Sequence, residues 1–283
     1  MSIDPAAGQR GGKHRAARQP GARVRLLAAT ALVLLGIALA VGWWVTGGRW
    51  LSVDTPSMGE AAPVGTLVLT RPVELGEVRV GDIISFQPPE GGPIHTHRVS
   101  RVEGGAVFTK GDINGAEDPW PVAGDKLVGK VVARWWGMAW VVRSLPIVVP
   151  GVALVWLLTT WAAPRWRTAA RLVGVPLVLC AAILVLRPLV NASLLMTLGE
   201  EGTTTATVVG TGVLPVRVAD PDGVSADLRA GQVAELVSHA ADATGEVPLS
   251  IDAHMSWLWW TVCLGLCCVP LGASLALGRR VAT

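Results

Sequence analysis

The sequence predicts a mostly-β domain anchored by transmembrane α-helices, about four in number, together with a second small β-rich outer segment. The first observation is composition. The 283 residues are 51% hydrophobic and only 16% charged, which is too apolar for an ordinary soluble protein and typical of a chain with several membrane spans. The second is the pattern between the apolar runs, where short β-branched or alternating stretches are separated by Gly and Pro.

Four apolar runs are candidates for membrane spans. The first contains twenty residues without a charge, which at about 1.5 Å per helical residue matches a hydrocarbon core of roughly 30 Å. The third has only fifteen residues between Arg171 and Arg187, so it crosses the bilayer if these arginines reach the headgroups or if the run continues past Pro188. A re-entrant or interfacial segment is the alternative. The predicted spans are 26–45, 145–163, 172–187 and 255–278.

Positive charges near the span ends predict the orientation, because cytoplasmic flanks retain Lys and Arg. With four spans, the three basic stretches fall on one side. They comprise Arg10, Lys13, Arg15, Arg18, Arg23 and Arg25 in the tail, Arg165, Arg167 and Arg171 between spans two and three, and Arg279 and Arg280 at the end. The chain is therefore expected to be a multi-pass protein of the cell membrane, with a cytoplasmic tail at 1–25 and with 46–144 and 188–254 extracytoplasmic.

A cleavable secretory signal is the alternative interpretation of the N-terminus. The stretch Ala38-Leu39-Ala40 has small residues at the two positions that a signal peptidase recognises. The apolar run is, however, longer than the core of about 7–15 residues that such signals have. A retained anchor is therefore favoured.

Charge and cysteine usage exclude other classes of function. The net charge of +3 is small and no sustained basic face is present, so nucleic acid is not an expected partner. All cysteines fall inside predicted spans, which leaves no disulfide framework. No metal site is predicted. The cysteine cluster lies in the fourth predicted span, and no His or carboxylate accompanies it within that span. The cysteines are Cys180, Cys263, Cys267 and Cys268.

The two segments between the spans differ in character. Segment 46–144 predicts a compact, mostly antiparallel β domain, with strands at 66–70, 83–87, 94–102, 106–109 and 127–133. Segment 188–254 has nine acidic residues, and its only cations are Arg217 and Arg229. Strands are expected at 203–209 and 213–218 and a short helix at 230–241. No catalytic constellation is present there, so this segment is expected to be dispensable for hydrolysis.

Segment 46–144 contains residues suited to peptide hydrolysis without a metal, which requires a nucleophile, a base and a group that fixes the base. Ser57 lies a dozen residues beyond the first span, although a lone serine there is typical of a solvated linker. In the strand-like run after Pro93, His95 and His97 share one face. They are ranked as base candidates above zinc ligands, because no third His or Cys is near.

The loop that follows, at 109–119, supplies Lys110, Asp112 and Asp118. Aspartates in such loops commonly form hydrogen bonds with the local backbone, and this purely structural role suits Asp112 better than Asp118. Lys110 is a third candidate base, but a lysine would need a pKa lowered by about three units to act near neutral pH, which a polar loop does not favour.

Four motifs in this order and spacing form a recognisable set. They are Pro56-Ser57-Met58 after the first span, Val80-Gly81-Asp82-Ile83-Ile84-Ser85-Phe86, His97-Arg98-Val99, and Lys110-Gly111-Asp112-Ile113-Asn114 with Asp118 six residues past Asp112. The set resembles signal peptidase I, in the form found in the endoplasmic reticulum, in archaea and in some Gram-positive bacteria. The resemblance covers roughly residues 26–145. It implies a membrane-anchored serine endopeptidase with a Ser-His-Asp active site.

By this resemblance Ser57 is the nucleophile, and His97 is the base in place of the lysine of the main bacterial enzymes. Asp118 orients His97, and Asp112 is a supporting residue. The implied reaction removes signal peptides from exported preproteins on the outer face of the membrane, with small residues at the first and third positions before the cut and no cofactor. The sequence departs from the family after Met58, where Gly59-Glu60 stands in place of the usual Glu-Pro.

Two other functions remain as alternatives. One is a catalytically inactive relative that serves as a membrane scaffold, which the presence of all three site residues disfavours. The other is a transporter or channel subunit, which the lack of charges inside the spans disfavours.

Overall fold

The structure is a computed structural model that describes residues 21–200, 203–239 and 247–258, and residues 260, 261, 264, 265 and 268. The chain divides into two compact units, residues 1–46 and residues 47–283, and each is described by itself. In the first unit, helix α1 spans Ala22–Val45. Its apolar stretch Leu27–Val45 has a mean hydropathy of 2.1 and is long enough to cross a membrane, as the charge-free run predicted.

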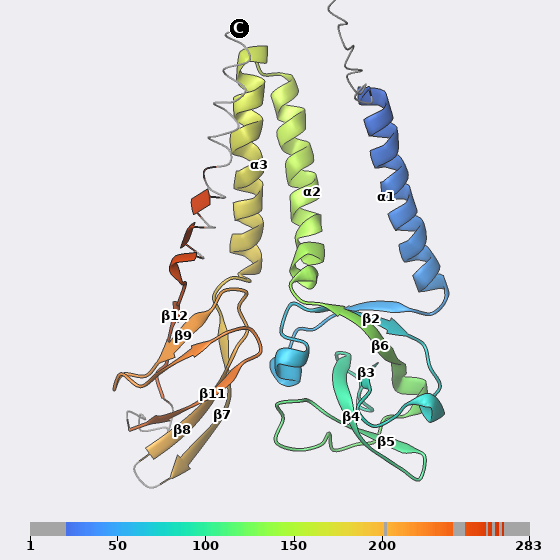
Figure 1. Cartoon of the computed structure of the whole chain (residues 1–283), viewed down its shortest axis with the longest axis vertical. Coiled ribbons are helices and arrows are strands. Elements are labelled where there is room, and N and C mark those ends of the chain that lie inside the picture. Colours follow the sequence, from blue (N-terminus) through green and yellow to red (C-terminus); the bar gives the residue numbers. More distant parts are fainter. Residues whose placement is uncertain are drawn as a thin grey trace, which may run out of the picture. The chain divides into compact units, whose positions relative to one another are not determined.

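The second unit begins with a six-stranded antiparallel sheet, here called the six-stranded domain (residues 47–137; Figure 1). The strands are β1 (Arg49–Ser52), β2 (Leu67–Arg71), β3 (Ile83–Phe86), β4 (His95–Glu103), β5 (Ala106–Lys110) and β6 (Leu127–Trp135), in the order β1-β2-β6-β3-β4-β5. Five of them coincide with the predicted runs. Strand β1 was not among the predicted runs; it is four residues long and follows α1 almost directly in the sequence.

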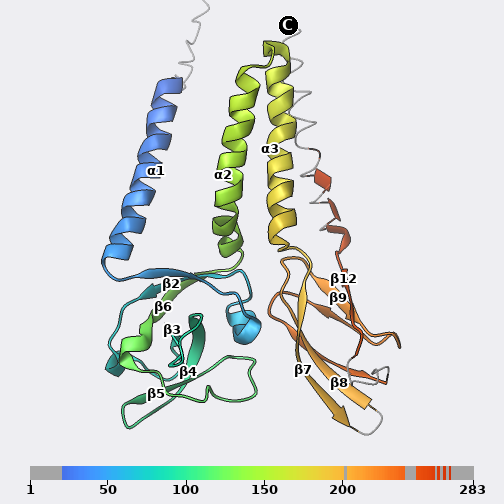
Figure 2. The ribbon, with the colours of Figure 1, turned by 180° about the vertical axis from the view of Figure 1, so that it is seen from behind.

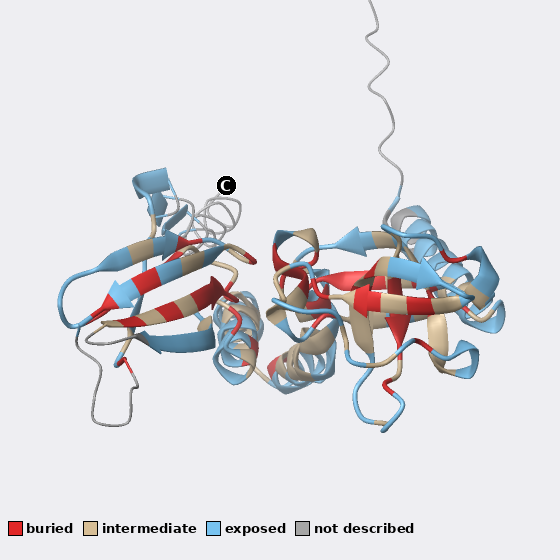
Figure 3. Ribbon diagram, turned by 90° about the horizontal axis from the view of Figure 1, so that it is seen from below, coloured by how far each residue is buried: buried red, intermediate tan, exposed pale blue. Residues whose placement is uncertain are grey.

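Two clusters of buried side chains form the core of this domain. One joins β3, β4 and β5 through residues that include Phe86, Val99 and Val107. The other packs Val53 and Val68 against Met58, which belongs to the short 3₁₀ helix η1 (Pro56–Ala61). Figure 3 shows that many of the buried residues lie on the strands of the sheets. Burial of Met58 attaches η1 to the sheet.

Helices α2 (Met138–Thr160) and α3 (Pro164–Leu186) form an antiparallel hairpin, and they lie side by side in both Figure 1 and Figure 2. Glycine permits their close packing, since a Cβ at Gly151 would lie 2.6 Å from Val178. Helix α2 begins before the predicted start at residue 145. Helix α3 continues unbroken through 165–171, and its 23 residues measure about 35 Å, so the helix is longer than the predicted third span at 172–187.

Three helices of the described chain are therefore long and apolar enough to cross a membrane. The fourth predicted span, 255–278, lies for the most part outside the described residues. The described residues form a mixture of helix and sheet rather than a mostly-β structure, because the apolar helices make up a large share of them.

The six-stranded domain is joined tightly to α2. Strand β6 leads into the helix at Gly137, and the N–H of Ala139 donates to the carbonyl oxygen of Gly65 at 3.1 Å. The indole of Trp140 covers Gly65 so closely that a Cβ there would lie 1.9 Å from Nε1. An ion pair between Arg143 and Asp54 adds a second link, three residues before Ser57.

The described residues between 188 and 254 fold as two three-stranded sheets, here called the sandwich module. One sheet contains β7 (Ala192–Glu200), β8 (Thr203–Gly210) and β11 (Val233–Ser238), and the other β9 (Val216–Ala219), β10 (Ser225–Leu228) and β12 (Ser250–Ala253). Val208 and Leu236 of the first sheet pack with Val216, Val218 and Leu228 of the second. The helix predicted at 230–241 is wrong, because the stretch alternates buried and exposed residues along β11.

Candidate active site

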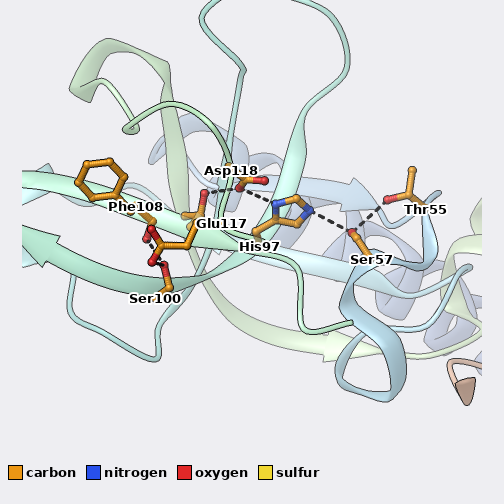
Figure 4. A network of polar contacts seen from close by, with 8 residues as sticks. Thr55, Ser57, His97, Ser100, Phe108, Glu117 and Asp118 are labelled. Carbon is orange, nitrogen blue, oxygen red and sulfur yellow. Dashed lines mark hydrogen bonds and ion pairs between the residues drawn. The ribbon is translucent and has the colours of Figure 1, made fainter. Parts of the chain in front are cut away.

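The structure brings together three of the predicted site residues, although they are far apart in the sequence. Nε2 of His97 lies 3.0 Å from Oγ of Ser57, and Nδ1 of His97 lies 2.8 Å from Oδ2 of Asp118. Ser57 comes from η1, His97 from β4, and Asp118 from the loop after β5. Figure 4 shows the imidazole between the hydroxyl and the carboxylate. This is the arrangement of a nucleophile, a base and an orienting acid.

The local sequence explains how Ser57 is presented. Pro56 stands at the first position of η1, where its restricted φ suits the start of a helix. Met58 is fully buried in the core, and Ser57, the residue before it, therefore lies at the edge of the core. The N–H of Ile113 donates to the carbonyl oxygen of Ser57 at 3.1 Å. The backbone of Ser57 is thus held on both sides, and its side chain is left directed at His97.

Gly59 stands where the sequences that the chain resembles usually have Glu, and its backbone conformation favours glycine. Its φ of 50° and ψ of −135° lie outside the helical region, in a conformation that favours glycine. A Cβ at this position would also lie 2.6 Å from Cγ2 of Ile113. A glutamate could not follow this path next to the nucleophile.

The alternation of β4 determines which side chains reach Ser57. His97 and Val99 are buried on one face, as the sequence predicted, and His97 is only 5% exposed. Val99 is paired with Thr109 on β5, so Thr109 shares this face. The hydroxyl of Thr109 donates to Oδ2 of Asp118 at 2.5 Å, and the N–H of Asp118 donates to the carbonyl oxygen of Thr109 at 2.8 Å.

The loop that carries Asp118 is also held through its neighbour. Oε1 of Glu117 accepts a hydrogen bond of 2.8 Å from the hydroxyl of Ser100 (Figure 4). Oε2 of Glu117 lies 3.2 Å from a guanidinium nitrogen of Arg101. Two strands, β4 and β5, therefore fix the position of the carboxylate that faces His97.

The protonation of Asp118 determines the tautomer of His97. Burial raises the pKa of Asp118, but hydrogen bonds from His97 and Thr109 outweigh the burial and lower the pKa below its ordinary value. An ionised carboxylate only accepts hydrogen bonds, so Nδ1 of the imidazole carries the proton. Nε2 is left with its lone pair directed at the Ser57 hydroxyl, which is the state that a general base requires.

His95 has a different environment. Its ring packs against Phe86 and His97, with centroid separations of 6.0 and 5.4 Å, and its buried Nδ1 has no hydrogen-bond partner. Burial and the nearby His97 lower the pKa of His95, which favours a neutral ring. His95 therefore packs beside His97 without taking part in its hydrogen bonds to Ser57 and Asp118.

Asp112, Arg98 and Lys110 lie on the opposite face of the sheet from His97. Arg98 forms a bidentate pair with Asp112 at 2.8 and 2.7 Å and donates to the carbonyl oxygen of Gly81 at 3.1 Å. Lys110 is paired with Arg98 in the β4/β5 register, which turns its side chain away from Ser57. Asp112 holds the loop next to Ile113 to β4 through Arg98, whereas the imidazole nitrogens of His97 face Asp118 and Ser57.

Two further residues contact the site and were missed by sequence reasoning. Thr109 orients Asp118, and Oγ1 of Thr55 lies 3.3 Å from Oγ of Ser57. The alternation of residues along 106–109 could have placed Thr109 on the same face as His97, but only if the register between β4 and β5 had been known.

Within the described residues, no group of three or more His, Cys, Asp or Glu side chains is placed to hold a metal ion.

No protein-family model and no curated protein matches the chain. The chemistry of the site is therefore argued from its geometry and from its sequence motifs.

Proposed function

We propose that this chain is a membrane-bound serine endopeptidase of the signal peptidase I type, which removes signal peptides from exported preproteins on the outer face of the membrane. The observation that carries the proposal is the pair of hydrogen-bonding contacts made by His97. Its Nε2 lies 3.0 Å from Oγ of Ser57, and its Nδ1 lies 2.8 Å from Oδ2 of Asp118. The choice of substrate rests on the four sequence motifs and on the apolar helix α2, which the Arg143–Asp54 ion pair links to the segment that carries Ser57.

In the proposed reaction, Oγ of Ser57 attacks the carbonyl carbon of the scissile peptide bond while Nε2 of His97 takes the hydroxyl proton. Asp118 stabilises the imidazolium that results. His97 then gives the proton to the leaving amine, the C–N bond breaks, and the signal peptide remains as an ester of Ser57. Water, deprotonated by His97, hydrolyses the ester and restores the serine. No cofactor is required by these steps.

The developing oxyanion requires N–H donors next to Ser57. In the first turn of a 3₁₀ helix the leading N–H groups have no partner within the helix. Ser57 and Met58 occupy this turn of η1. Their N–H groups are the donors that we propose, because they lie nearest to the nucleophile.

The test uses the full chain, purified in detergent, with a preprotein whose signal peptide ends in Ala-x-Ala. Wild type is expected to release the signal peptide, and Ser57→Ala to abolish release. Ser52→Ala is the matched control, because it removes a hydroxyl from nearby β1 that hydrogen-bonds only Asp54 at 2.7 Å. Cleavage by folded Ser57→Ala at the wild-type rate would refute the proposal. No cleavage by wild type of any preprotein tested would favour the inactive scaffold.

A further inference from the structure

We propose that the sandwich module is a positioning element of the active site: the backbone at Gly231 supports the backbone of Gly59, two residues after Ser57. The inference rests on the proposed function and deepens it. It differs from the expectation drawn from composition, by which residues 188–254 are dispensable for hydrolysis.

The close approach of two backbones carries the inference. Gly231 and Gly59 are both buried. A Cβ at Gly231 would lie 2.4 Å from the carbonyl oxygen of Gly59 and 2.7 Å from the nitrogen of Glu60, where no real Cβ fits. Gly231 also has a φ of 80°. Both the contact and the conformation require glycine at this position.

Gly231 is itself held firmly by the sandwich module. Its N–H donates to the carbonyl oxygen of Gly210 at 2.7 Å, at the end of β8. The next residue, Gln232, receives a hydrogen bond from the N–H of Arg229 through its side chain at 3.0 Å, which closes the turn between β10 and β11. A turn fixed in this way can act as a rigid support.

The segment that carries Ser57 needs such a support. Helix η1 is six residues long and its helical conformation is interrupted at Gly59. Ile113 contacts it from the six-stranded domain, and Gly231 contacts it from the sandwich module. A cavity of about 670 Å³ next to this contact has walls from both, including Met58 and Ile113 on one side and Leu228 and Gln232 on the other.

A displacement of η1 would move Oγ of Ser57 away from Nε2 of His97. Misplacement of a reacting group by about 1 Å can cost about a hundredfold in rate. We therefore expect Gly231→Ala to lower kcat about 10-fold to 100-fold. KM should change less than threefold, because the substrate contacts themselves are kept.

Gly223→Ala is the matched control. Gly223 has a φ of 88°, nearly that of Gly231, and lies in the same module, but a Cβ there would meet nothing within 4 Å. The two variants thus share the strain in the turn and differ in the contact with Gly59. Equal kcat values for the two folded variants, with wild type active, would overturn the inference and leave the proposed function intact.

Hydrogen exchange provides a readout that does not depend on activity. The amide of Ile113, bonded to Ser57, and the amides of η1 should exchange at least tenfold faster in Gly231→Ala than in Gly223→Ala. Unchanged exchange would overturn the inference, even if wild type proved inactive and the proposed function failed.

A crosslink tests the contact itself should Gly231→Ala fail to fold. Glu60 and Gln232 line the same cavity from the two sides, so Glu60→Cys combined with Gln232→Cys should be joined by a short bifunctional thiol reagent. Glu60→Cys with Asp222→Cys is the control pair, because Asp222 lies in the exposed turn after β9 and lines neither this cavity nor its neighbour. Equal crosslinking of both pairs, or of neither, would overturn the inference.

Discussion

The hydroxyl of Thr109 lies 2.5 Å from Oδ2 of Asp118, the same oxygen that accepts the hydrogen bond from His97 at 2.8 Å. Thr109 is fully buried, so no water can replace it without rearrangement. Its hydroxyl lowers the pKa of Asp118 together with His97, against the opposing effect of burial. Thr109 therefore positions the carboxylate that accepts the hydrogen bond of His97, the residue proposed as the base.

Replacement of Thr109 by valine is expected to lower kcat by about 10-fold to 100-fold, since one hydrogen bond to a charged group contributes about 1.5–3 kcal/mol. Thr109→Ser keeps the hydroxyl and should retain activity within about threefold, at the cost of a small cavity. Steady-state kinetics of both variants would check this. A valine variant as active as the serine variant would show that Thr109 only fills space.

His97→Ala is expected to reduce turnover by roughly three to six orders of magnitude, the effect of removing a member of such a triad. His95→Ala removes only a ring that packs beside the base, and Lys110→Ala removes a side chain on the other face of the sheet, so both should be much milder. Single-turnover cleavage rates would distinguish them. If Lys110→Ala were inactive and His97→Ala nearly normal, the base would be a lysine.

Stability should depend on pH through Asp82, in the motif before β3. Burial raises the pKa of Asp82, but hydrogen bonds from Lys130 and from the N–H of Arg79 outweigh it and lower the pKa. A lowered folded pKa gives stability that is complete above the unfolded value of about 3.9 and is lost as the pH falls through the folded value.

Asp82→Asn should therefore lower the free energy of unfolding by about 1 kcal/mol at pH 7 and by progressively less below about pH 4. Thermal unfolding of wild type and of Asp82→Asn in detergent, at pH 7 and at a pH below about 4, measures this loss of stability. Asp125→Asn is the control, because Asp125 is exposed on the short helix η3 (Gly124–Lys126) and forms no ion pair with any residue that the structure describes. An effect of Asp82→Asn that is equal at both pH values would contradict the assignment.

The proposed topology can be tested by labelling single cysteines in intact cells, in a background without the native cysteines. A reagent that cannot cross the membrane is expected to label Ser225→Cys, in the sandwich module, and to spare Ala163→Cys, in the turn between α2 and α3. Both positions are exposed. The reverse pattern would place the site on the cytoplasmic side and exclude exported substrates.

Local patterns in the sequence predicted much of the fold. The charge-free run before Val45 predicted α1, and β-branched runs predicted β2 to β6, because burial and backbone conformation at these positions depend mainly on each residue and its near neighbours. The same patterns failed at β11. The spacing of the apolar residues at 230–241 was compatible with a helix, but hydrogen bonding to β8 makes Val233–Ser238 a strand.

The sequence by itself determined which residues could form the site, because the motifs with Ser57, His97 and Asp118 occur in a specific order. Only the tertiary structure decided their partners. The pairing of Val99 with Thr109 places Thr109 on the face of His97, while the pairing of Arg98 with Lys110 turns Lys110 to the other face. The contact of Gly59 with Gly231 joins segments far apart in the chain. Strand register and backbone approach depend on the packing of distant segments, which no local pattern encodes.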